Sequence, residues 1–500
     1  MLDKSKTIRQ EQGITTWRNA GCMGTLNYVM RFGKTRIIEL VVQRTLAKYK
    51  DREIILLVPT DIAYKNVEYI VKKYHIQCYT LTTVANILEE KKLDSYLLII
   101  DEIHRFVGEK AINVIKSIKF KYTLGLTGST LSRDSKTILA RTGFPVIDII
   151  TEEEAIANNW ISDYDEYNVA IDIADNEKRH YKMLSEAITN ISSNFSGLYI
   201  RMNNLFKIKY FKGDYELIRC LYIGYTIRDK NFNKIGYIEA DILRKIVAKI
   251  HGYEHGGIIT NNLTRRMYEF WNPDNIEELA KTYIKCVNTR NDYLKHNVSK
   301  VNAVLDLTNV INKPTIIFND SIDMIDQLYN TIKGTKVKYH SAIDPIMKRY
   351  DNGEIITYLS GDKQGQPRMF GATTQKKDAI ESLNNGTVQF LITGKSLNES
   401  LNIPSIEYII CSSGDTNATT YDQRVARGKT IDDNNSSKKC TIINLFIDDF
   451  TYNEEFILSR DKQKLVTRQE NVKNVIWIEN ISDMICTINN KHISLHHERR

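Results

Sequence analysis

The segment Tyr96–His104 constrains the fold of this 500-residue chain more than any other stretch. It opens with an apolar run, Leu97 to Ile100, which is too short for a buried helix and is typical of a strand covered on both faces. Asp101 and Glu102 follow directly, where such a strand emerges at the ligand-binding edge of an open α/β sheet. The two carboxylates could hold Mg²⁺ and activate a water, or they could form an ordinary acidic helix cap. The rest of the chain decides between these interpretations.

Composition sets the outer limits of the fold and of the partners. The length predicts two to four domains, and an apolar content of 42% is enough for real cores. No apolar run is long enough to cross a bilayer, and the first ten residues lack a signal-peptide core, so we expect a cytoplasmic protein with no membrane partner. The seven cysteines are scattered without a CxxC pair, which argues against a zinc ribbon or a disulfide framework. The net charge of +8 is compatible with a polyanionic partner.

Short apolar runs alternate with amphipathic helical stretches in both halves of the chain. In the first half we expect strands at 25–30, 53–58, 96–100 and 122–126, which predict a doubly wound parallel sheet within residues 1–165. Strands expected at 314–318, 355–359, 388–393, 407–411 and 440–446 predict a second α/β layer within residues 301–450. Residues 166–300 lack this alternation and are predicted to form a mainly helical insertion, and residues 451–500 a C-terminal extension.

A turn that could bind phosphate joins the first expected strand to the following helix. Gly33 allows close backbone approach, Lys34 can reach terminal phosphates, and the Thr35 hydroxyl can ligate Mg²⁺ at a helix N-terminus. The pattern departs from GxxxxGK[ST] because Tyr28 stands where the first glycine is expected. The acidic pair begins 66 residues after Thr35, and this order of turn and carboxylates is the layout of a P-loop NTPase.

With these features the chain resembles superfamily 2 helicases and translocases, and the resemblance extends over both halves. In the first half, the segments that resemble family motifs are Val58-Pro59-Thr60 (motif Ia), Asp101-Glu102-Ile103-His104 (a DEAH-type motif II) and Leu126-Thr127-Gly128-Ser129-Thr130 (motif III). Arg9 and Gln12, with Trp17 downstream, resemble the region of this family that reads adenine. The form MRFGKT, with Arg31 and Phe32 before Gly33, resembles that of bacteriophage helicases.

The second half continues the resemblance in the expected order. Pro314 to Phe318 resembles motif IV, and Thr393 to Pro404 resembles motif V, with Ser400 and Asn402 in place of glycine and aspartate. Gln423 to Thr430 resembles motif VI, and Thr430 stands where its last arginine is expected. Lys429 could substitute for that arginine, so one or two arginine fingers are both open. In the alternative interpretation, the two arginines of this segment are surface charges on a helix.

The resemblance implies two RecA-like domains with ATP and Mg²⁺ between them, and it assigns roles to individual residues. The implied catalytic residues are Lys34, Asp101, Glu102, Gln423, Arg424 and Arg427. The implied nucleotide-binding residues are Arg9, Gln12, Arg31, Phe32, Gly33, Lys34, Thr35 and Asn402. Thr35 and Asp101 would hold Mg²⁺. Residues implied to couple the cleft to nucleic acid are Pro59, Thr60, His104, Thr127, Ser129 and Thr393.

The middle of the chain carries two further patterns. Basic and aromatic residues interleave over 198–238, which suits single-stranded nucleic acid but also a helical subdomain whose rings pack inward. His251 to His255 has the HxxEH spacing of some zinc peptidases, but Gly252 within it and the two glycines after it argue against the helix that such a site requires.

The sequence therefore predicts an ATP-dependent DNA helicase of superfamily 2 that acts in replication, recombination or repair. Its partner would be nucleic acid, with DNA favoured over RNA, and a monomer is plausible. If the chain is of phage origin, we expect it in the host cytoplasm. Three alternatives stay open: a translocase on duplex DNA without strand separation, an RNA helicase, and a nucleic-acid-binding protein with a decayed ATPase.

Overall fold

The computed structural model divides the chain into two compact units. The structure describes residues 4–90, 92–129, 131–200, 204, 212–229, 273–340, 343, 345–347, 354–358, 364–394, 403, 405–414, 418–432, 435, 438–469, 472 and 474–497. The first unit comprises residues 1–172, 298–448 and 459–500, and the second comprises residues 173–297 and 449–458. Within the described residues, no helix is long and apolar enough to cross a membrane.

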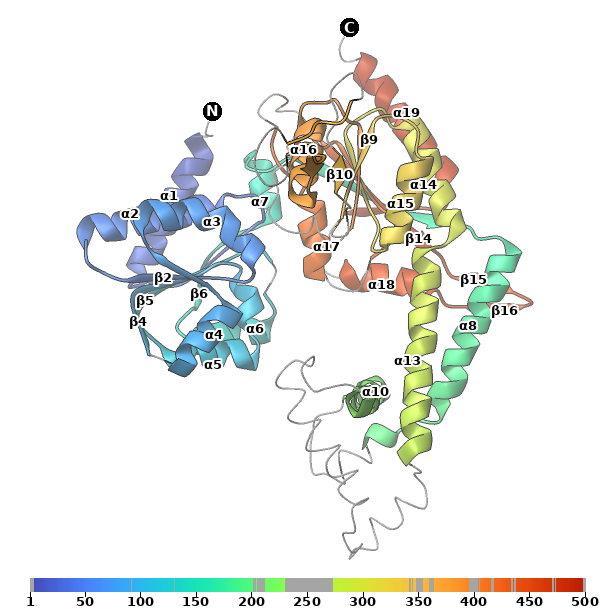
Figure 1. The fold of residues 1–500 in the computed structure, drawn as a ribbon, viewed down its shortest axis with the longest axis horizontal. Coiled ribbons are helices and arrows are strands. Elements are labelled where there is room, and N and C mark those ends of the chain that lie inside the picture. The colour runs from blue at the N-terminus through green and yellow to red at the C-terminus, as the bar shows by residue number, and fades with distance from the viewer. Residues whose placement is uncertain are drawn as a thin grey trace, which may run out of the picture. The chain divides into compact units, whose positions relative to one another are not determined.

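The first unit contains two α/β lobes, and the first lobe is built on a six-stranded parallel sheet (Figure 1). Its strand order is β3-β2-β4-β5-β1-β6. The strands are β1 (Met23–Tyr28), β2 (Ile54–Val58), β3 (Gln77–Thr80), β4 (Leu93–Ile100), β5 (Ile118–Thr127) and β6 (Val146–Ile150). The order places β5 between β4 and β1, so the segments that follow these three strands meet at one edge of the sheet.

Helices cover both faces of this sheet, because its central strands are apolar on both sides. One face is covered by α1 (Lys4–Asn19), α2 (Lys34–Lys48) and α3 (Asp61–Tyr74), and the other by α4 (Leu81–Glu90), α5 (Glu109–Ser117) and α6 (Arg133–Arg141). Alternate residues of β4 serve the two cores: Leu97 and Ile99 pack with α1–α3, whereas Leu98 and Ile100 pack with α4–α6. The 3₁₀ turn η1 (Ile103–Phe106) follows β4, and α7 (Glu152–Ala157) follows β6.

The second lobe is built on a seven-stranded parallel sheet of order β17-β7-β14-β13-β8-β12-β9. Its strands are β7 (Tyr164–Ile171), β8 (Thr315–Phe318), β9 (Lys336–Tyr339), β12 (Phe390–Thr393), β13 (Tyr408–Cys411), β14 (Cys440–Ile447) and β17 (Val475–Ile478). One core contains α14 (Val298–Val310), α15 (Ile322–Thr331) and α19 (Ile481–His497), and the other contains α16 (Ala372–Asn384) and α17 (Ala418–Val425). The remaining elements are α18 (Arg460–Arg468) and the short pair β10 (Ile346–Met347) and β11 (Met369–Phe370).

Two sequence predictions about these boundaries need correction. The predicted border between residues 165 and 166 falls inside β7, which pairs with β14 and belongs to the second sheet rather than to an insertion. The predicted strand 355–359 is not formed as a strand in its described part, where Thr357 and Tyr358 make only isolated β-bridges. The predicted C-terminal extension supplies β17, which pairs with β7, and α19, which packs against α14.

The second unit consists of helices and one hairpin in its described part. Its helices are α8 (Asp175–Ser193), α10 (Asp214–Asp229) and α13 (Pro273–Lys295), and α13 contacts both of the others. The strands β15 (Phe450–Tyr452) and β16 (Glu455–Ile457) form a hairpin whose β15 strand contacts α8. Residues 201–203, 205–211 and 230–238 of the basic and aromatic stretch 198–238, and the whole of His251–His255, lie outside the described residues.

Candidate functional site

Three loops converge at the carboxyl edge of the first sheet because their strands are neighbours. Asp101 and Glu102 follow β4, Gly128 and Ser129 follow β5, and the turn that ends at Gly33 follows β1. In the sequence these segments are far apart. The order β4-β5-β1 therefore brings together the predicted acidic pair, the predicted motif III and the predicted phosphate turn.

The phosphate turn is held in a conformation that directs α2 toward this edge. Gly33 has a φ of 96° and Arg31 a φ of 69°, both in the left-handed region, and α2 begins at Lys34. The first N–H groups of a helix have no partner within the helix, so the start of α2 is suited to an anion. Gln10 on α1 supports the turn by donating from Nε2 to the carbonyl oxygen of Phe32 at 3.1 Å.

Lys34 reaches across the edge to the acidic pair. Its Nζ lies 3.4 Å from Glu102 Oε1, and both side chains are largely buried. Gly128 allows this approach, because a Cβ at that position would lie 2.5 Å from Lys34 Nζ and 3.1 Å from the backbone nitrogen of Met30. The departure from the usual alanine in motif III thus makes room for the lysine.

The two carboxyl groups of the pair are in opposite electrostatic situations. Burial, together with the negative charge of Glu102, raises the pKa of Asp101 above its usual value. Burial also opposes ionisation of Glu102, but the positive charge of Lys34 and the hydrogen bond with His104 outweigh it and lower the pKa of Glu102. Glu102 therefore stays ionised at neutral pH. For Asp101, an added positive charge nearby would stabilise the ionised form of the carboxyl group.

His104 joins the acidic pair to the loop after β5. Its Nδ1 lies 2.9 Å from Thr127 Oγ1 and 3.3 Å from Glu102 Oε2, and its Nε2 lies 3.5 Å from Ser129 Oγ. Thr127 Oγ1 also accepts a hydrogen bond from the backbone N–H of Ser129. The imidazole of His104 thus contacts Glu102 of the acidic pair as well as Thr127 and Ser129, and the resemblance implies a role in coupling or catalysis for all four residues.

A pocket in the first unit contains residues of both lobes. The residues that line it are Met30, Arg31, Lys34, Pro59, Thr60, Ala63, Glu102, Arg105, Gln423, Ala426 and Arg427. Four of these side chains are cationic and one is a carboxylate, which suits a polyanion. Arg31 donates from Nε to the carbonyl oxygen of Ala426 at 3.3 Å, and burial lowers the pKa of its guanidinium to about 10.

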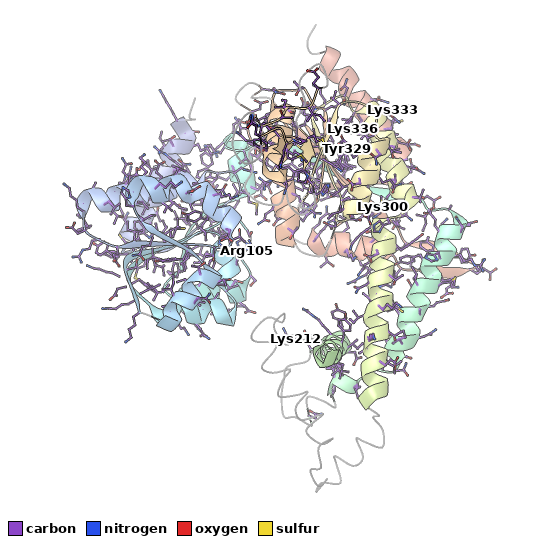
Figure 2. All side chains as sticks on the ribbon, in the orientation of Figure 1. Arg105, Lys212, Lys300, Tyr329, Lys333 and Lys336 are labelled. Carbon is purple, nitrogen blue, oxygen red and sulfur yellow. The ribbon has the colours of Figure 1, made fainter. Side chains whose placement is uncertain are left out.

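Sequence reasoning missed two residues of this site. Arg105 (Figure 2) lines the pocket and directly follows His104, so its position beside motif II was the available signal. Gln10 supports the phosphate turn, whereas Gln12, which the resemblance implies as an adenine-binding residue, is exposed. The helical spacing of Gln10 with Gly13, Ile14 and Trp17, all of which are buried, could have identified it.

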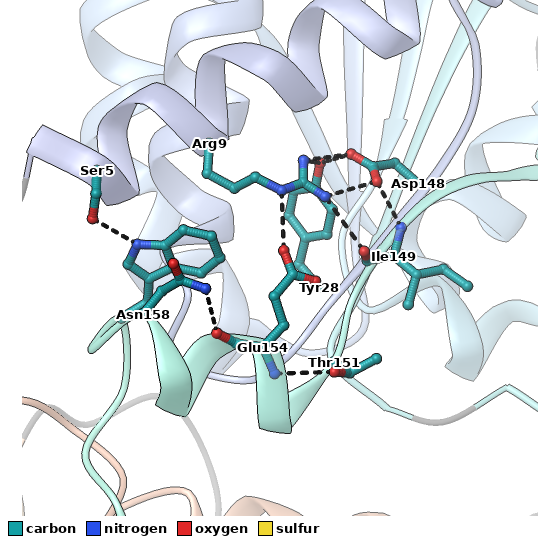
Figure 3. Close-up of polar contacts among 9 residues, drawn as sticks. Ser5, Arg9, Tyr28, Asp148, Ile149, Thr151, Glu154 and Asn158 are labelled. Atoms are coloured by element: carbon teal, nitrogen blue, oxygen red, sulfur yellow. Dashed lines mark hydrogen bonds and ion pairs between the residues drawn. The ribbon is translucent and has the colours of Figure 1, made fainter.

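Two residues that the resemblance implies for nucleotide binding have partners within the first lobe. Arg9 donates to both carboxylate oxygens of Asp148, at 2.7 and 2.8 Å, and also contacts Glu154 (Figure 3). Phe32 is fully buried and packs edge-on against Tyr28 and Trp160. Tyr28, which replaces the first glycine of the usual pattern, donates from its hydroxyl to Asp148 at 2.6 Å and so ties β1 to β6.

The arginine segment of the second lobe separates into residues in the pocket and residues outside it. Gln423 and Arg427 line the pocket, as the resemblance implies. Arg424 does not: its guanidinium forms a buried ion pair with Asp320 and also lies over the ring of Phe318. Lys429, which could have replaced a second arginine, forms an ion pair with Glu152, with 2.5 Å between Nζ and Oε1, and its Nζ lies 4.2 Å from the ring centroid of Tyr164.

The other predicted residues occupy varied places. Pro59 and Thr60 line the pocket, and the Thr60 side chain caps α3 by accepting from the N–H of Ala63 at 3.2 Å. Thr393 is fully buried at the end of β12, and its hydroxyl donates to the carbonyl oxygen of Tyr339 at 2.7 Å. Asn402 lies outside the described residues.

The donors at the edge fit a magnesium ion that arrives with a nucleotide. No cluster of three or more His, Cys, Asp or Glu side chains in the described part of the chain could hold a metal by itself. Glu102 Oε2 is buried 3.3 Å from His104 Nδ1, and the raised pKa of Asp101 marks a carboxylate that a nearby cation would stabilise. Because Mg²⁺ usually combines one or two carboxylates with substrate phosphates and waters, Asp101 and Thr35 are a suitable protein contribution.

Comparison with known proteins adds a family match for the second lobe. Residues 299–429 match the model of the helicase conserved C-terminal domain. The match runs from α14 to Lys429 and includes Gln423 and Arg427 of the pocket. No curated protein matches the sequence.

Solved structures match the fold over nearly the whole chain. A Leu-to-Val variant of S. cerevisiae Dbp5 bound to RNA and ADP BeF3 is similar with a TM-score of 0.50 and 10% identity, over 96% of this chain and 92% of that one. The Pyrococcus furiosus Hef helicase domain is 14% identical with a TM-score of 0.44, over 92% of this chain and 98% of that one, a score too low to support an argument. At such identities the first similarity concerns the fold alone, and it confirms the predicted class of two RecA-like α/β domains.

Proposed function

We propose that the chain is an ATP-driven motor of superfamily 2 that moves on nucleic acid, with DNA as its polymer. The observation that carries the proposal is the composition of one pocket. Lys34 Nζ and Glu102 Oε1 lie 3.4 Å apart in it, and Arg427 of the other lobe also lines it. A lysine on a helix N-terminus, an ionised glutamate and an arginine from a second lobe are the groups that nucleoside triphosphate hydrolysis requires. The helicase C-terminal match over residues 299–429 supports the same reaction class.

Each side chain of the pocket has a separate duty in this reaction. Lys34 and the first N–H groups of α2 bind the terminal phosphates. Glu102, whose pKa is lowered, is ionised at neutral pH and can orient the attacking water and accept its proton. Asp101 and Thr35 would hold Mg²⁺, which neutralises charge on the phosphates when it is bound.

The distribution of these groups over two lobes couples hydrolysis to movement. Arg427 and Gln423 come from α17 and the residues after it, whereas Lys34 and Glu102 belong to the first lobe. An arginine supplied across a cleft contributes roughly 10³–10⁵ in rate, so hydrolysis is fast only while the lobes are closed on the nucleotide. His104 would pass the state of Glu102 to Thr127 and Ser129, and from there to the bound strand.

Two other polymers or modes are alternatives within the motor class. The Dbp5 variant with the similar fold is bound to RNA, which makes RNA the second candidate polymer for this chain. Translocation on duplex DNA without strand separation uses the same ATPase pocket. DNA strand separation is preferred because the arrangement of motifs resembles phage and bacterial fork-remodelling helicases more than RNA-processing DEAH proteins.

The test is ATP turnover by purified protein with single-stranded DNA, forked DNA, duplex DNA and RNA in parallel. We expect DNA to stimulate turnover, Glu102→Gln to lower kcat roughly 10²–10⁴-fold while ATP binding is retained, and Lys34→Ala to abolish both. The matched control is Lys65→Ala, an exposed lysine on α3. ATP turnover that is unchanged in the Lys34 and Glu102 variants would refute the proposed mechanism. Strand displacement and triplex displacement assays then separate a helicase from a duplex translocase.

A further inference from the structure

A cluster of tyrosines and cations covers part of the first lobe away from the candidate site. The cluster, called here the tyrosine–cation cluster, consists of Tyr49, Tyr96, Tyr122, Lys48, Arg52 and Lys121. It arises where α2 ends at Lys48, so that side chains of β4 and β5 cover the sheet face beyond the helix. Tyr96 and Tyr122 pack partly against the core beneath, whereas Tyr49 and all three cations are exposed.

The rings form a row, and each is contacted by a cation. The centroid of Tyr96 lies 5.1 Å from that of Tyr49 and 5.1 Å from that of Tyr122. Lys48 lies 5.3 Å from the ring of Tyr49, and Arg52 lies 5.3 Å from that of Tyr96. Lys121 lies 5.5 Å from the ring of Tyr96 and 5.2 Å from that of Tyr122. These separations are within the range of cation–π attraction.

The way in which these cations are held leaves their charge available. A cation beside a carboxylate has its charge partly offset, as for Lys119 and Asp94 with 3.8 Å between Nζ and Oδ2, whereas a cation beside a ring has no such opposite charge. Within the described residues, Lys48, Arg52 and Lys121 form no ion pair. The neighbouring Lys50, Asp51 and Glu53 are exposed, and with them included four cations face two carboxylates. The cluster is therefore a net positive surface whose cations are already positioned.

The cluster is separate from the ATP pocket. Tyr49 and Arg52 lie in the connection between α2 and β2, which leads into the amino end of β2. Asp101, Gly128 and Gly33 follow the carboxyl ends of their strands, at the opposite edge of the same sheet. None of the cluster residues is among those that line the pocket. Its charge is accordingly not explained by nucleotide binding.

We propose that the tyrosine–cation cluster is a second nucleic-acid contact, which binds the phosphate backbone of DNA outside the track served by the ATPase cleft. This inference rests on the proposed function, since it names a further surface for the same polymer. Surfaces that bind single strands combine cations for the phosphates with aromatic rings that can contact bases, and this cluster alternates the two. Phosphate contacts through cations give affinity and position without sequence preference.

A second group of lysines, on the other lobe, also lies beside a tyrosine ring, but protection of a sheet edge explains its position. Lys336 and Lys338 lie 5.5 and 5.6 Å from the ring of Tyr329, and Lys333 is close to them in the sequence (Figure 2). These lysines flank or belong to β9, the edge strand of the second sheet, where lysines prevent pairing with another chain. Lys338 is also neutralised by Asp326 at 2.6 Å. The strand residues of the tyrosine–cation cluster, Tyr96, Lys121 and Tyr122, lie on the interior strands β4 and β5, where edge protection offers no explanation.

The experiment compares the full-length protein with its Arg52→Glu/Lys121→Glu double variant by fluorescence anisotropy on labelled single-stranded and duplex DNA. The matched control, Lys65→Glu/Lys72→Glu on α3, makes the same change in net charge at exposed lysines of the same lobe. We expect the cluster variant to lose about tenfold or more in affinity, and the slope of log K against log salt to decrease by about 1.4 on single strands, which corresponds to two phosphate contacts. The control variant should bind nearly as the unmodified protein does.

ATP turnover without DNA separates failure of this inference from failure of the proposed function. If the unmodified protein hydrolyses ATP and binds DNA, but the cluster variant binds with unchanged affinity and salt slope, the second contact is refuted and the motor remains. If the cluster and control variants lose affinity equally, the effect is one of net charge and the inference is again wrong. An Arg52→Gln/Lys121→Gln variant, which adds no carboxylate, should give the same direction of change and guards against misfolding of the charge-reversed protein.

Discussion

Single residues of the arginine segment illustrate how similar side chains acquire different duties. Arg424 and Arg427 are three positions apart, and the resemblance assigns both to catalysis. Arg427 lines the pocket with Lys34 and Glu102. Arg424 is turned into the second lobe, where its side chain and that of Asp320 are each 4% exposed. We therefore expect Arg427 to act in the proposed reaction and Arg424 to stabilise the fold.

Alanine substitutions should separate these duties. We expect Arg427→Ala to lower kcat by roughly 10³–10⁵ with little change in thermal stability, because it removes a charge that acts on the transition state. We expect Arg424→Ala to destabilise the second lobe by about 3–5 kcal/mol, because it leaves the carboxylate of Asp320 buried and unpaired. ATPase assays and thermal melting of the two variants under one buffer provide the measurement. Equal loss of stability in both variants would contradict the assignment.

The residue scale also shows what the sequence could and could not predict. Lys34 and Glu102 lie close together as expected for loop positions that follow parallel strands of one sheet, and Arg427 of the second lobe lines the same pocket. The support of the phosphate turn by Gln10 was not predicted, because a motif gives a residue type and an approximate place, whereas this contact depends on which side of α1 faces the turn. The inward packing of Phe32 depends on Trp160, which is distant in the sequence and not part of any motif.

At the scale of elements, a buried polar network holds α17 in the second lobe. Glu166 on β7 accepts hydrogen bonds at Oε1 from the Tyr421 hydroxyl of α17 and from the Gln469 side chain, and also from Asn444 of β14 at 3.1 Å. Gln469 further exchanges hydrogen bonds with Asn168 of β7, at 2.8 and 3.0 Å. The network thus fixes the helix that precedes Arg427 to two central strands.

Titration of Glu166 should make the stability of this lobe depend on pH. Burial is the largest influence, and it raises the pKa of Glu166 above its usual value of 4.5 although Tyr421 opposes the shift. The folded protein therefore binds this proton more tightly than the unfolded chain does. The resulting contribution to stability is present below pH 4.5 and is lost as the pH rises through the pKa of the folded state.

In the Glu166→Gln variant the side chain at this position cannot ionise. The variant should therefore not lose stability through this titration as the pH rises. We expect it to be destabilised by about 1–3 kcal/mol at acidic pH, because an amide disturbs the pattern of donors, and we expect the difference from the unmodified protein to shrink as the pH rises. Urea denaturation of both proteins at several values between pH 5 and pH 8 provides the measurement. Glu186→Gln, on the exposed side of α8, is the control. A difference that is constant or grows with pH would show that Glu166 is ionised in the fold throughout.

On the scale of the whole molecule, the second lobe is assembled from distant parts of the chain. β7 precedes the second unit in the sequence, yet it pairs with β14 over eight residues, from Tyr164 with Cys440 to Ile171 with Ile447. β17 and α19 follow the family match, which ends at Lys429, and Met484 and Ile488 of α19 are fully buried in the core of the lobe. Local periodicity predicted β8, β12, β13 and β14 but not β9, and it could not reveal that a strand before the insertion joins the same sheet.

This arrangement predicts which fragments fold. Residues 299–429 lack β7, β14 and β17, so we expect them to be insoluble despite their match to a domain model. Residues 298–497 regain β14 and β17 but leave the apolar edges of both strands without β7 between them, and an exposed edge of this kind aggregates. A fragment that joins residues 160–172 to residues 298–497 through a short flexible linker restores β7. We expect this fragment to be monomeric and to contain both helix and sheet. Size-exclusion chromatography and circular dichroism of the three fragments provide the test. A soluble, cooperatively unfolding 298–497 fragment would show that β7 is an accessory strand rather than part of the minimal lobe.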